Sequence, residues 1–319
     1  MNLLTSWLAS PPPDAAIEIA GDRVTAALVD LRSSGPVVSG YASEPLRAGA
    51  VTPSLTAANI QDRHAVTGSI QRVVEKLGIR PRRVALVIPD TAVKVSLLRF
   101  DNVPSRRDDF DQLVRWQLRK AAPFPVETAS ITYSAALTPP EGGREFVVEV
   151  ARQECVREYE SVCEDAGLYA GLVDMATFSL LGILTDNTAA TGDWLLVHMR
   201  PDYTSIAIVR NGAVIFYRNR PEDGQEGLPD LVHQTSMYYQ DRLSGGTFAR
   251  VYLAGAGRAP GVADAARKGM EERLGVAVEP LDPTRAASLS DRITATPELM
   301  DVLGPAIGLL CRTQGEVRA

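Results

Sequence analysis

An order of predicted elements that occurs twice, once in each half of the chain, constrains the fold most. In the first half, residues 16–20 and 24–29 are short apolar runs on either side of Gly21-Asp22, which predicts a hairpin of two strands. Residues 83–90 then predict a buried strand that ends in a turn. A chain that repeats this order needs two sheets, each covered by helices, and therefore two α/β lobes.

The second half begins near residue 193 and follows the same order. The apolar runs 194–199 and 205–210 predict two strands, and Asn-Gly at 211–212 predicts a tight turn into a return strand at 213–218. Residues 251–257 follow as a buried strand that leads into a glycine loop. Apolar periodicity predicts further elements: helices at about 65–78, 229–243, 262–274 and 297–312, and a strand at 276–278.

A smaller module lies inside the first half. Residues 91–167 run as strand, helix, strand, strand, helix, with a first helix at 107–122, and this pattern predicts a small α/β subdomain inserted into the first lobe. The 319 residues are also too many for a single compact core. The predicted domains are an N-terminal extension (1–14), a first lobe (15–192) that contains the insert (about 91–167), and a second lobe (193–319).

Composition and charge exclude several classes of protein. Lys and Arg number 33 against 39 Asp and Glu, so the formal net charge is −6, which argues against a nucleic-acid partner. Apolar runs such as 180–184 are far too short to span a bilayer, and the first ten residues lack the basic region of a secretion signal. Three cysteines show no metal-ligand spacing. We therefore expect free thiols in a reducing cytosol and no bound metal.

Several segments of the chain resemble one protein family. They are RVALVIPDTAVKV (83–95), VRWQLRKAAPFPVETASITY (114–133), AGLYAGLVDMATFSLLGIL (166–184), SMYYQDRL (236–243) and VYLAGAG (251–257). The Arg-Trp…Pro-Phe-Pro block is the most specific of them, and together the similarity covers about residues 16–310. On these segments the chain resembles the PilM family of type IV pilus assembly proteins.

The resemblance implies the actin/sugar-kinase ATPase fold, in which two ribonuclease H-like lobes face a cleft and the first lobe carries a small α/β insert. It also implies that residues 166–184 form a helix that returns to the first lobe. The function it implies is that of a cytoplasmic scaffold, peripheral to the inner membrane. Such a scaffold binds the N-terminal tail of a PilN-like membrane protein, so its contact with the membrane is indirect.

The two hairpin turns of this fold normally cradle phosphates, and here they depart from the family pattern. Backbone N–H groups approach phosphate closely only at Gly or another small residue, and Mg²⁺ needs acidic oxygens nearby. The first turn, similar to Asp-Ile-Gly-Ser-Ser in the family, keeps an acid at Glu18 and a glycine at Gly21 but has Ala20 at the key position. The second, similar to Asp-Ile-Gly-Ala, has become His198-Met-Arg200-Pro.

These departures leave two interpretations of Arg200. It either grips phosphate in place of Mg²⁺, or the second hairpin is kept only as an element of the fold. The glycine loop with Gly255 and Gly257 keeps its small residues, so the resemblance implies a weak or vestigial ATP site without Mg²⁺. We expect no catalytic residue, because hydrolysis needs a metal and both phosphate turns. Asp174 is a candidate base, or a residue that starts a helix.

The resemblance places the partner's tail in a groove of the first lobe and its insert. An extended peptide would fill apolar pockets there and pair its backbone with the protein. We expect the groove near Arg115, Trp116, Arg119 and Phe124. Trp116 lies off the apolar face of its predicted helix, so it either marks a partner surface or packs under a neighbouring element of the insert.

Three other functions stay open on the sequence. The glycine loop favours a working actin-like ATPase, which the second hairpin opposes. A cytoplasmic scaffold of the related type II secretion system also resembles PilM, although no C-terminal membrane span is present here. A filament-forming relative of the FtsA cell-division proteins is the third, and with it self-association into rings or filaments.

The N-terminal extension carries an apolar helical arc of Leu3, Leu4, Trp7 and Leu8 before three prolines. Because it contains no Lys or Arg, it lacks the electrostatic attraction to anionic lipids that strengthens membrane binding. A disordered tail is the default for a terminus. Its Asn-Leu-Leu also resembles the Asn-Leu-Leu-Pro core of the PilN tail, which implies that it can fill the groove of its own protomer or of a neighbour.

Overall fold

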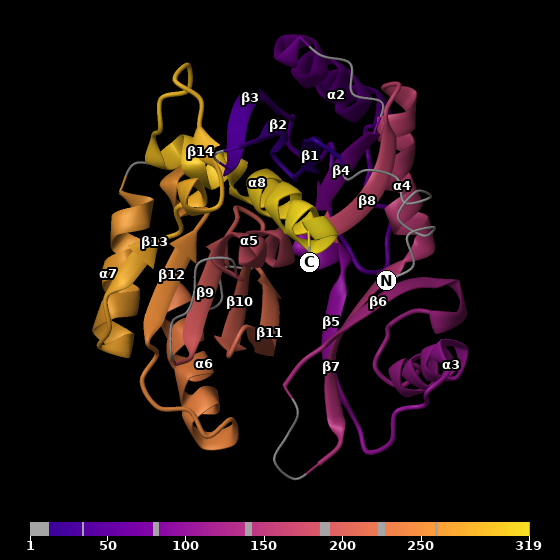
Figure 1. The fold of residues 1–319 in the computed structure, drawn as a ribbon, viewed down its shortest axis with the longest axis vertical. Helices are drawn as coiled ribbons and strands as arrows, with labels where there is room; N and C mark the ends of the chain where they lie inside the picture. Colours follow the sequence, from indigo (N-terminus) through magenta and orange to yellow (C-terminus); the bar gives the residue numbers. More distant parts are fainter. Residues whose placement is uncertain are drawn as a thin grey trace.

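The computed structural model describes most of the chain as two α/β lobes and an insert (Figure 1). The described residues are 13–33, 35–78, 83–137, 142–185, 192–222, 227–258 and 261–318. Most of the N-terminal extension (1–12) lies outside them. Within the described part, no helix is both long enough and apolar enough to cross a bilayer.

The first sheet has six strands in the order β14-β3-β2-β1-β4-β8. They are β14 (Ser288–Leu289), β3 (Gly35–Pro45), β2 (Arg23–Arg32), β1 (Ala15–Ile19), β4 (Arg83–Ile88) and β8 (Tyr169–Met175). β1, β2 and β3 pair antiparallel, and β1, β4 and β8 pair parallel. The predicted hairpin and the predicted strand at 83–90 are confirmed, and both lie at the centre of the sheet.

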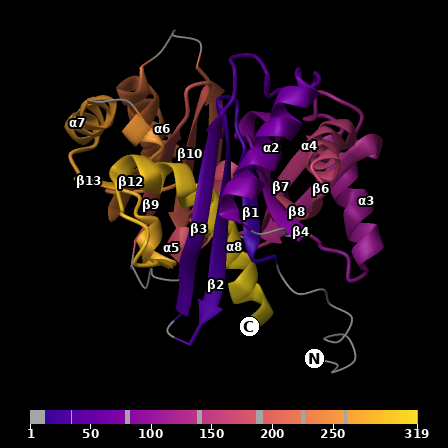
Figure 2. The same cartoon turned by 90° about the horizontal axis from the view of Figure 1, so that it is seen from above.

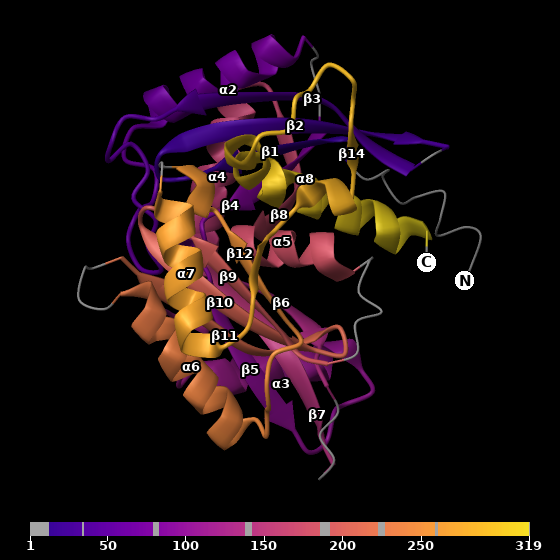
Figure 3. The same cartoon turned by 90° about the vertical axis from the view of Figure 1, so that its left-hand side faces the viewer.

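Helices cover both faces of the first sheet, in keeping with its nearly continuous apolar strands. These helices are α2 (Arg63–Leu77), α4 (Gln153–Asp165), α5 (Ala176–Thr185) and α8 (Pro297–Arg318). Ile17 and Leu86 pack with α2 and α4 on the outer face, whereas Ala16 and Val87 pack with α8 on the inner face. Figure 2 shows α2 and α4 on the outer face, and Figure 3 shows α8 and α5 on the inner one.

The second sheet has the order β11-β10-β9-β12-β13. Its elements are β9 (Trp194–Met199), β10 (Tyr203–Arg210), β11 (Ala213–Pro221), β12 (Arg250–Ala254) and β13 (Val278–Pro280), with α6 (Leu228–Arg242) and α7 (Val262–Leu274) on the outer face. The turn at Asn211-Gly212 has φ of 51° and 78°, the positive values that a two-residue hairpin requires. Trp194 and Leu196 face inward, toward α5.

The molecule is therefore layered, with α8 and α5 between the two sheets (Figure 3). α5 and α8 cross closely, because a Cβ atom on Gly182 would lie 2.6 Å from the carbonyl oxygen of Gly308. The sequence assigned residues 288–319 to the second lobe, but β14 joins the first sheet and α8 packs on its inner face. The division of the chain at residue 193 stays a prediction.

The insert is a three-stranded antiparallel sheet in the order β5-β7-β6, covered on its outer side by α3 (Figure 1). Its elements are β5 (Lys94–Phe100), α3 (Arg107–Leu118), β6 (Ala129–Ala135) and β7 (Arg144–Arg152). Phe100, Phe110 and Phe146 form its aromatic core, with ring centroids 4.7–5.9 Å apart. The described residues also include the short 3₁₀ turns η1 (Asp90–Ala92), η2 (Val126–Thr128), η3 (Ala256–Arg258) and η4 (Pro283–Arg285).

Three expectations about local structure need correction. Residues 166–184 are not one helix, because 169–175 forms β8 and only α5 is helical. β3 was not predicted, since its sequence mixes Gly and Ser with apolar residues and its extended form depends on pairing with β2. The helix at 155–167, assigned to the insert, is α4, and its Tyr159 and Val162 pack in the core of the first sheet.

Candidate functional site

The two hairpin turns predicted to bind phosphate face each other across the boundary between the lobes. Each turn is closed by its own hydrogen bond, from Ala20 N to Arg23 O (2.9 Å) in the first and from Arg200 N to Tyr203 O (2.8 Å) in the second. A Cβ atom on Gly21 would lie 3.2 Å from the carboxylate of Asp202, so the turns approach one another at this glycine.

A buried ion pair joins the two turns. Arg200 Nη2 lies 2.9 Å from Glu18 Oε1, and both side chains are 2% exposed. Burial opposes the charged form, but the negative charge of Glu18 outweighs it and raises the pKa of Arg200 above its usual value. Two sequence-predicted site residues are thus brought together, and they bind each other.

The pair is joined through one contact only. Glu18 Oε2 and Arg200 Nη1 are buried, and neither has a hydrogen-bond partner among the described residues. A buried charge pair depends on both members, since removal of one leaves an uncompensated charge in a medium that solvates it poorly. The arrangement therefore favours the second interpretation of Arg200, in which it stabilises the contact between the hairpins.

The glycine loop after β12 is also occupied by protein. Gly255 has φ of +79°, and a Cβ atom there would lie 2.0 Å from the carbonyl oxygen of Met199, so only glycine fits. The N–H groups of Gly255 and Gly257 donate to the two carboxylate oxygens of Asp301 on α8, at 2.8 and 2.5 Å. Asp301 thus takes the donors that an anionic ligand of this loop would use.

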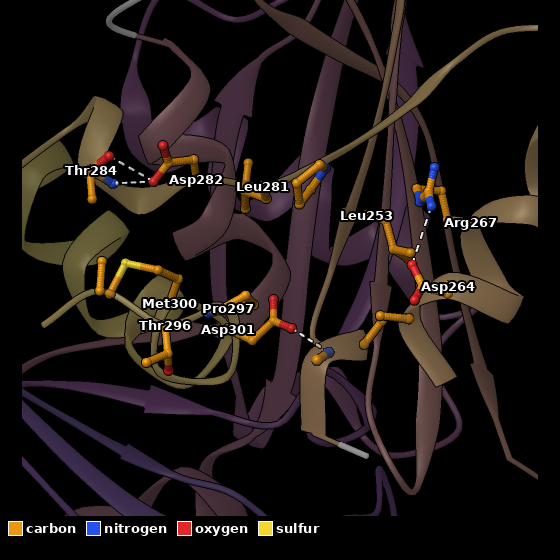
Figure 4. Close-up of a pocket in the computed structure, with 15 residues that line it drawn as sticks. Leu253, Asp264, Arg267, Leu281, Asp282, Thr284, Thr296, Pro297, Met300 and Asp301 are labelled. Carbon is orange, nitrogen blue, oxygen red and sulfur yellow. Dashed lines mark hydrogen bonds and ion pairs between the residues drawn. The ribbon is translucent and has the colours of Figure 1, made fainter. Parts of the chain in front are cut away.

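A cavity of about 460 Å³ lies beside this loop (Figure 4). Most of its wall is apolar and comes from β12, α7, the end of β13 and the start of α8, with Leu253, Leu281 and Met300 among its members. The polar groups at its edge are largely engaged already, as in the bonds from Arg267 to Asp264 and from Thr284 to Asp282 seen in Figure 4. Its size admits a nucleoside-sized molecule.

A second polar cluster under the hairpins was not predicted. Asp90, at the end of β4, accepts hydrogen bonds from Thr177 N (2.9 Å) on α5 and Ser205 Oγ (2.5 Å) on β10. His198 Nδ1 lies 2.9 Å from Thr177 Oγ1 and 3.8 Å from Asp90. Burial raises the pKa of Asp90, but the hydrogen bond and charge of His198, with Ser205 and Thr177, bring it below its usual range. The cluster joins the lobes, and only the short Pro-Asp turn after β4 hinted at it.

Asp174 lies at the carboxyl end of β8, next to the start of α5. Its Oδ1 accepts a hydrogen bond from Met175 N at 2.7 Å, and its Oδ2 binds Arg312 of α8. Neither contact is the bond to a first-turn amide that a helix cap makes, because Thr177 N of α5 donates to Asp90 instead. The bond to Arg312 engages one oxygen of the carboxylate, which does not favour a role as catalytic base. In the part of the chain that the structure describes, no three His, Cys, Asp or Glu side chains are placed to hold a metal.

The four residues expected at a partner groove lie on α3 and on the segment that follows it, in different environments. Trp116 is 59% exposed on α3, which rules out packing under the insert. Arg115 Nη1 donates to Val126 O at 2.5 Å and lines a cavity of about 520 Å³ between α3 and β6. Arg119 pairs with Glu127 on the surface at 2.9 Å, and Phe124 packs against the edge of the insert core.

Another cavity, of about 100 Å³, lies on the opposite side of the insert sheet. It is bounded by β6 and β7 of the insert, by β8 of the first sheet and by α4. Both β6 and β8 are edge strands of their sheets. An edge strand offers unpaired backbone groups that an added strand can use, so this groove between the insert and the first sheet suits an extended peptide.

Comparison with known proteins identifies the family. No curated protein matches the sequence, but the family model described as type IV pilus assembly protein PilM matches residues 16–242. The solved structure of a PilM-PilN type IV pilus biogenesis complex is similar, with 18% identity over 95% of this chain and 99% of that chain and a TM-score of 0.80. A Bacteroides thetaiotaomicron protein with an actin-like ATPase fold and unknown function shares 7% identity over 95% of this chain and 98% of that chain, with a TM-score of 0.50.

These structural similarities confirm the predicted two-lobed actin-like fold. The matched family model covers well over half of the chain. The chain belongs to the PilM family of type IV pilus assembly proteins.

Proposed function

We propose that this chain is a cytoplasmic scaffold at the inner-membrane platform of the type IV pilus, where it binds the N-terminal tail of a PilN-like membrane protein. Membership of the PilM family and the similarity to the chain of a PilM-PilN complex support this role. Because the partner spans the membrane, contact of the scaffold with the membrane is indirect. Self-association into rings or filaments remains part of the proposal.

The main support for the proposal that this protein does not hydrolyse ATP is the Glu18–Arg200 ion pair between the hairpin turns. ATP hydrolysis in such a cleft needs room for phosphates, a metal and a positioned water. Here the acid that would serve the metal is bound to Arg200, and Asp301 occupies the amides of the glycine loop. We propose that nucleotide binds weakly, that Mg²⁺ adds nothing, and that no turnover occurs.

One observation favours the alternative of an actin-like ATPase. The 460 Å³ cavity beside Gly257 has room for a base and ribose. The charged side chains that line it are Asp264, Asp282, Asp301 and Arg267. Arg267 already pairs with Asp264, so the cavity offers little positive charge to bind a phosphate chain. We therefore propose that the cavity binds a nucleoside moiety weakly, and we rank ATP hydrolysis below the scaffold role.

Two surfaces of the insert are candidates for the partner's tail. One is the outer side around Arg115, Trp116, Arg119 and Phe124, supported by the large exposed indole. The other is the groove between the insert and β8, which has two edge strands to pair with an extended peptide. We favour the groove, because backbone pairing there would not depend on a single side chain.

A binding measurement separates these alternatives. A fluorescent peptide with the N-terminal cytoplasmic sequence of PilN is titrated with the full-length protein, with and without ATP and Mg²⁺. The scaffold role predicts saturable binding that nucleotide does not change. Loss of binding in Trp116→Ala with retention in Val173→Ala would place the tail on the outer surface instead. Absence of any binding contradicts the proposed function.

A further inference from the structure

Glu149 lies in the middle of β7, the central strand of the insert sheet, on the face turned toward the first lobe. Val147 and Ala151, on the same face of the strand, are buried in the core of the first lobe, whereas the alternate residues face α3. Directly across the sheet from Glu149 are Val95 and Thr132. Neither carries a charge, so the insert sheet itself provides no cation for this carboxyl group.

The side chain of Glu149 is half-buried and lines the 100 Å³ cavity. It makes no hydrogen bond or ion pair with any residue that the structure describes. The charged groups that face it from other elements are Asp174 of β8, Asp90 of η1 and Arg312 of α8. Arg312 is already bound to Asp174, so negative charge prevails around the cavity.

The shape of the cavity limits what can enter it. Apolar side chains form most of its wall: Ile88, Val93, Val156 and Val173. A volume of about 100 Å³ admits one side chain and excludes a nucleotide or a folded element. An apolar wall with a carboxyl group suits a side chain that has an aliphatic stem and a cationic end, which describes Lys and Arg.

We propose that this cavity is a subsite for one basic side chain of an extended peptide that lies between the insert and β8, with the Glu149 carboxylate as its ion-pair partner. The inference rests on the proposed function, since the peptide is the tail of the PilN-like partner. It adds to that function a requirement on the partner's sequence. A Lys or Arg must follow the backbone-paired segment at the position that meets β7.

The subsite has a dependence on pH that a merely structural glutamate would lack. Burial, and after it the charge of Asp174, raises the pKa of Glu149 to about 8. At pH 7 the empty subsite therefore holds the protonated acid, with Asp174, Asp90 and Arg312 as the charged groups around it. A bound cation favours the ionised form, so binding releases a proton and strengthens as the pH rises toward 8.

Fluorescence anisotropy with the full-length protein and a peptide of the PilN N-terminal sequence tests the proposal. Each Lys of the peptide is replaced in turn by norleucine and each Arg by citrulline, and one further peptide is acetylated at its amino end. We expect one neutral replacement to weaken binding about tenfold or more. Glu149→Gln should weaken the native peptide by a similar factor and abolish the pH dependence, and the two changes together should cost no more than either alone.

Glu145→Gln is the matched control, because Glu145 lies on the same face of β7 but outside the cavity. It should bind the native peptide as the wild type does. Glutamine has the shape of the protonated acid, so Glu149→Gln should fold, which urea unfolding checks. Equal affinity of all neutral side-chain variants, or a loss on acetylation alone, overturns the subsite and leaves the proposed function standing. Failure of the wild type to bind the native peptide overturns the proposed function as well.

Discussion

The cleft between the hairpin turns and the groove between the insert and β8 each hold a carboxyl group that is buried or half-buried, but only the groups of the cleft have partners. In the cleft, Glu18 is bound to Arg200 and Asp301 to two glycine amides. In the groove, Glu149 has no partner within the described chain. Placing an acid in a half-buried position without a counter-charge is unfavourable, so Glu149 needs a reason, whereas the paired groups are explained by the contacts they already make.

This difference indicates which of the two regions is suited to bind a partner. A site whose charges are paired internally gains little from a ligand and must first break its own contacts to accept one. A site with an unmatched group gains from a partner that supplies the missing charge. The cleft between the hairpin turns belongs to the first kind, since the charges of Glu18 and Arg200 are paired even though one buried atom of each lacks a hydrogen-bond partner among the described residues. The groove beside the insert belongs to the second.

The largest effect should come from breaking the buried pair in the cleft. Arg200→Met leaves Glu18 without a counter-charge, so we expect the free energy of unfolding to fall by about 3–5 kcal/mol. Adding Glu18→Met should recover most of this loss, because two apolar side chains of similar volume replace two charges. Urea unfolding at pH 7 measures both.

Arg119→Met is the control for that comparison, since its pair with Glu127 has side chains 60% and 58% exposed. An exposed pair contributes less than about 1 kcal/mol. A loss in Arg200→Met no greater than in this control would mean that the cleft is hydrated and open, and the contrast between cleft and groove would disappear.

The next effect concerns the glycine loop. Asp301→Ala removes the acceptor of the Gly255 and Gly257 amides, so we expect a loss of about 2–3 kcal/mol, reduced by water that reaches the loop from the adjacent cavity. Asp264→Ala at the edge of the same cavity has a side chain 82% exposed and should cost less than about 0.5 kcal/mol. Equal stability of the two variants would show that Asp301 does not hold the loop.

A smaller effect, with a distinct pH dependence, should come from the groove. The pKa of Glu149 is raised from 4.5 to about 8, so between these values the unfolded chain ionises while the folded protein keeps its proton. Stability from this group is therefore fully present below pH 4.5 and is lost as the pH rises through 8. Glu149→Gln should match the wild type near pH 4.5. The full shift corresponds to about 4–5 kcal/mol at pH 8, and because Glu149 is only half-buried we expect the variant to gain on the order of 2 kcal/mol there. A difference that does not change with pH would mean that the carboxyl group is hydrated.

The smallest expected effect is that of nucleotide on the wild type. If the cleft is filled by its own side chains, millimolar ATP should raise the free energy of unfolding by less than about 0.4 kcal/mol, which corresponds to a dissociation constant weaker than the concentration used. Mg²⁺ should make no difference. Thermal unfolding with ATP, with ATP and Mg²⁺, and with adenosine measures this, and a saturable shift that requires Mg²⁺ would place phosphate in the cleft after all.

Much of the fold follows from local patterns. Continuous apolar runs such as 83–90, and turn residues such as Asn211-Gly212, favour one local structure wherever they occur, and both predictions are confirmed. β3 and β8 escaped because their extended form depends on pairing with β2 and β4. Segments of mixed composition take the structure that their neighbours impose.

For the functional sites, the sequence by itself determined the family and the departure of both hairpin turns from the family pattern, because each depends on which residues are present at a position. It left open whether Trp116 is exposed, which the structure decides. Only the tertiary structure decided that Arg200 binds Glu18, that Asp301 occupies the glycine loop and that Glu149 stays unpaired. The partners in these contacts come from separate strands and helices, up to 182 residues apart for Glu18 and Arg200. Whether a buried charge is paired depends on what surrounds it, and only the packing of the sheets and helices establishes those surroundings.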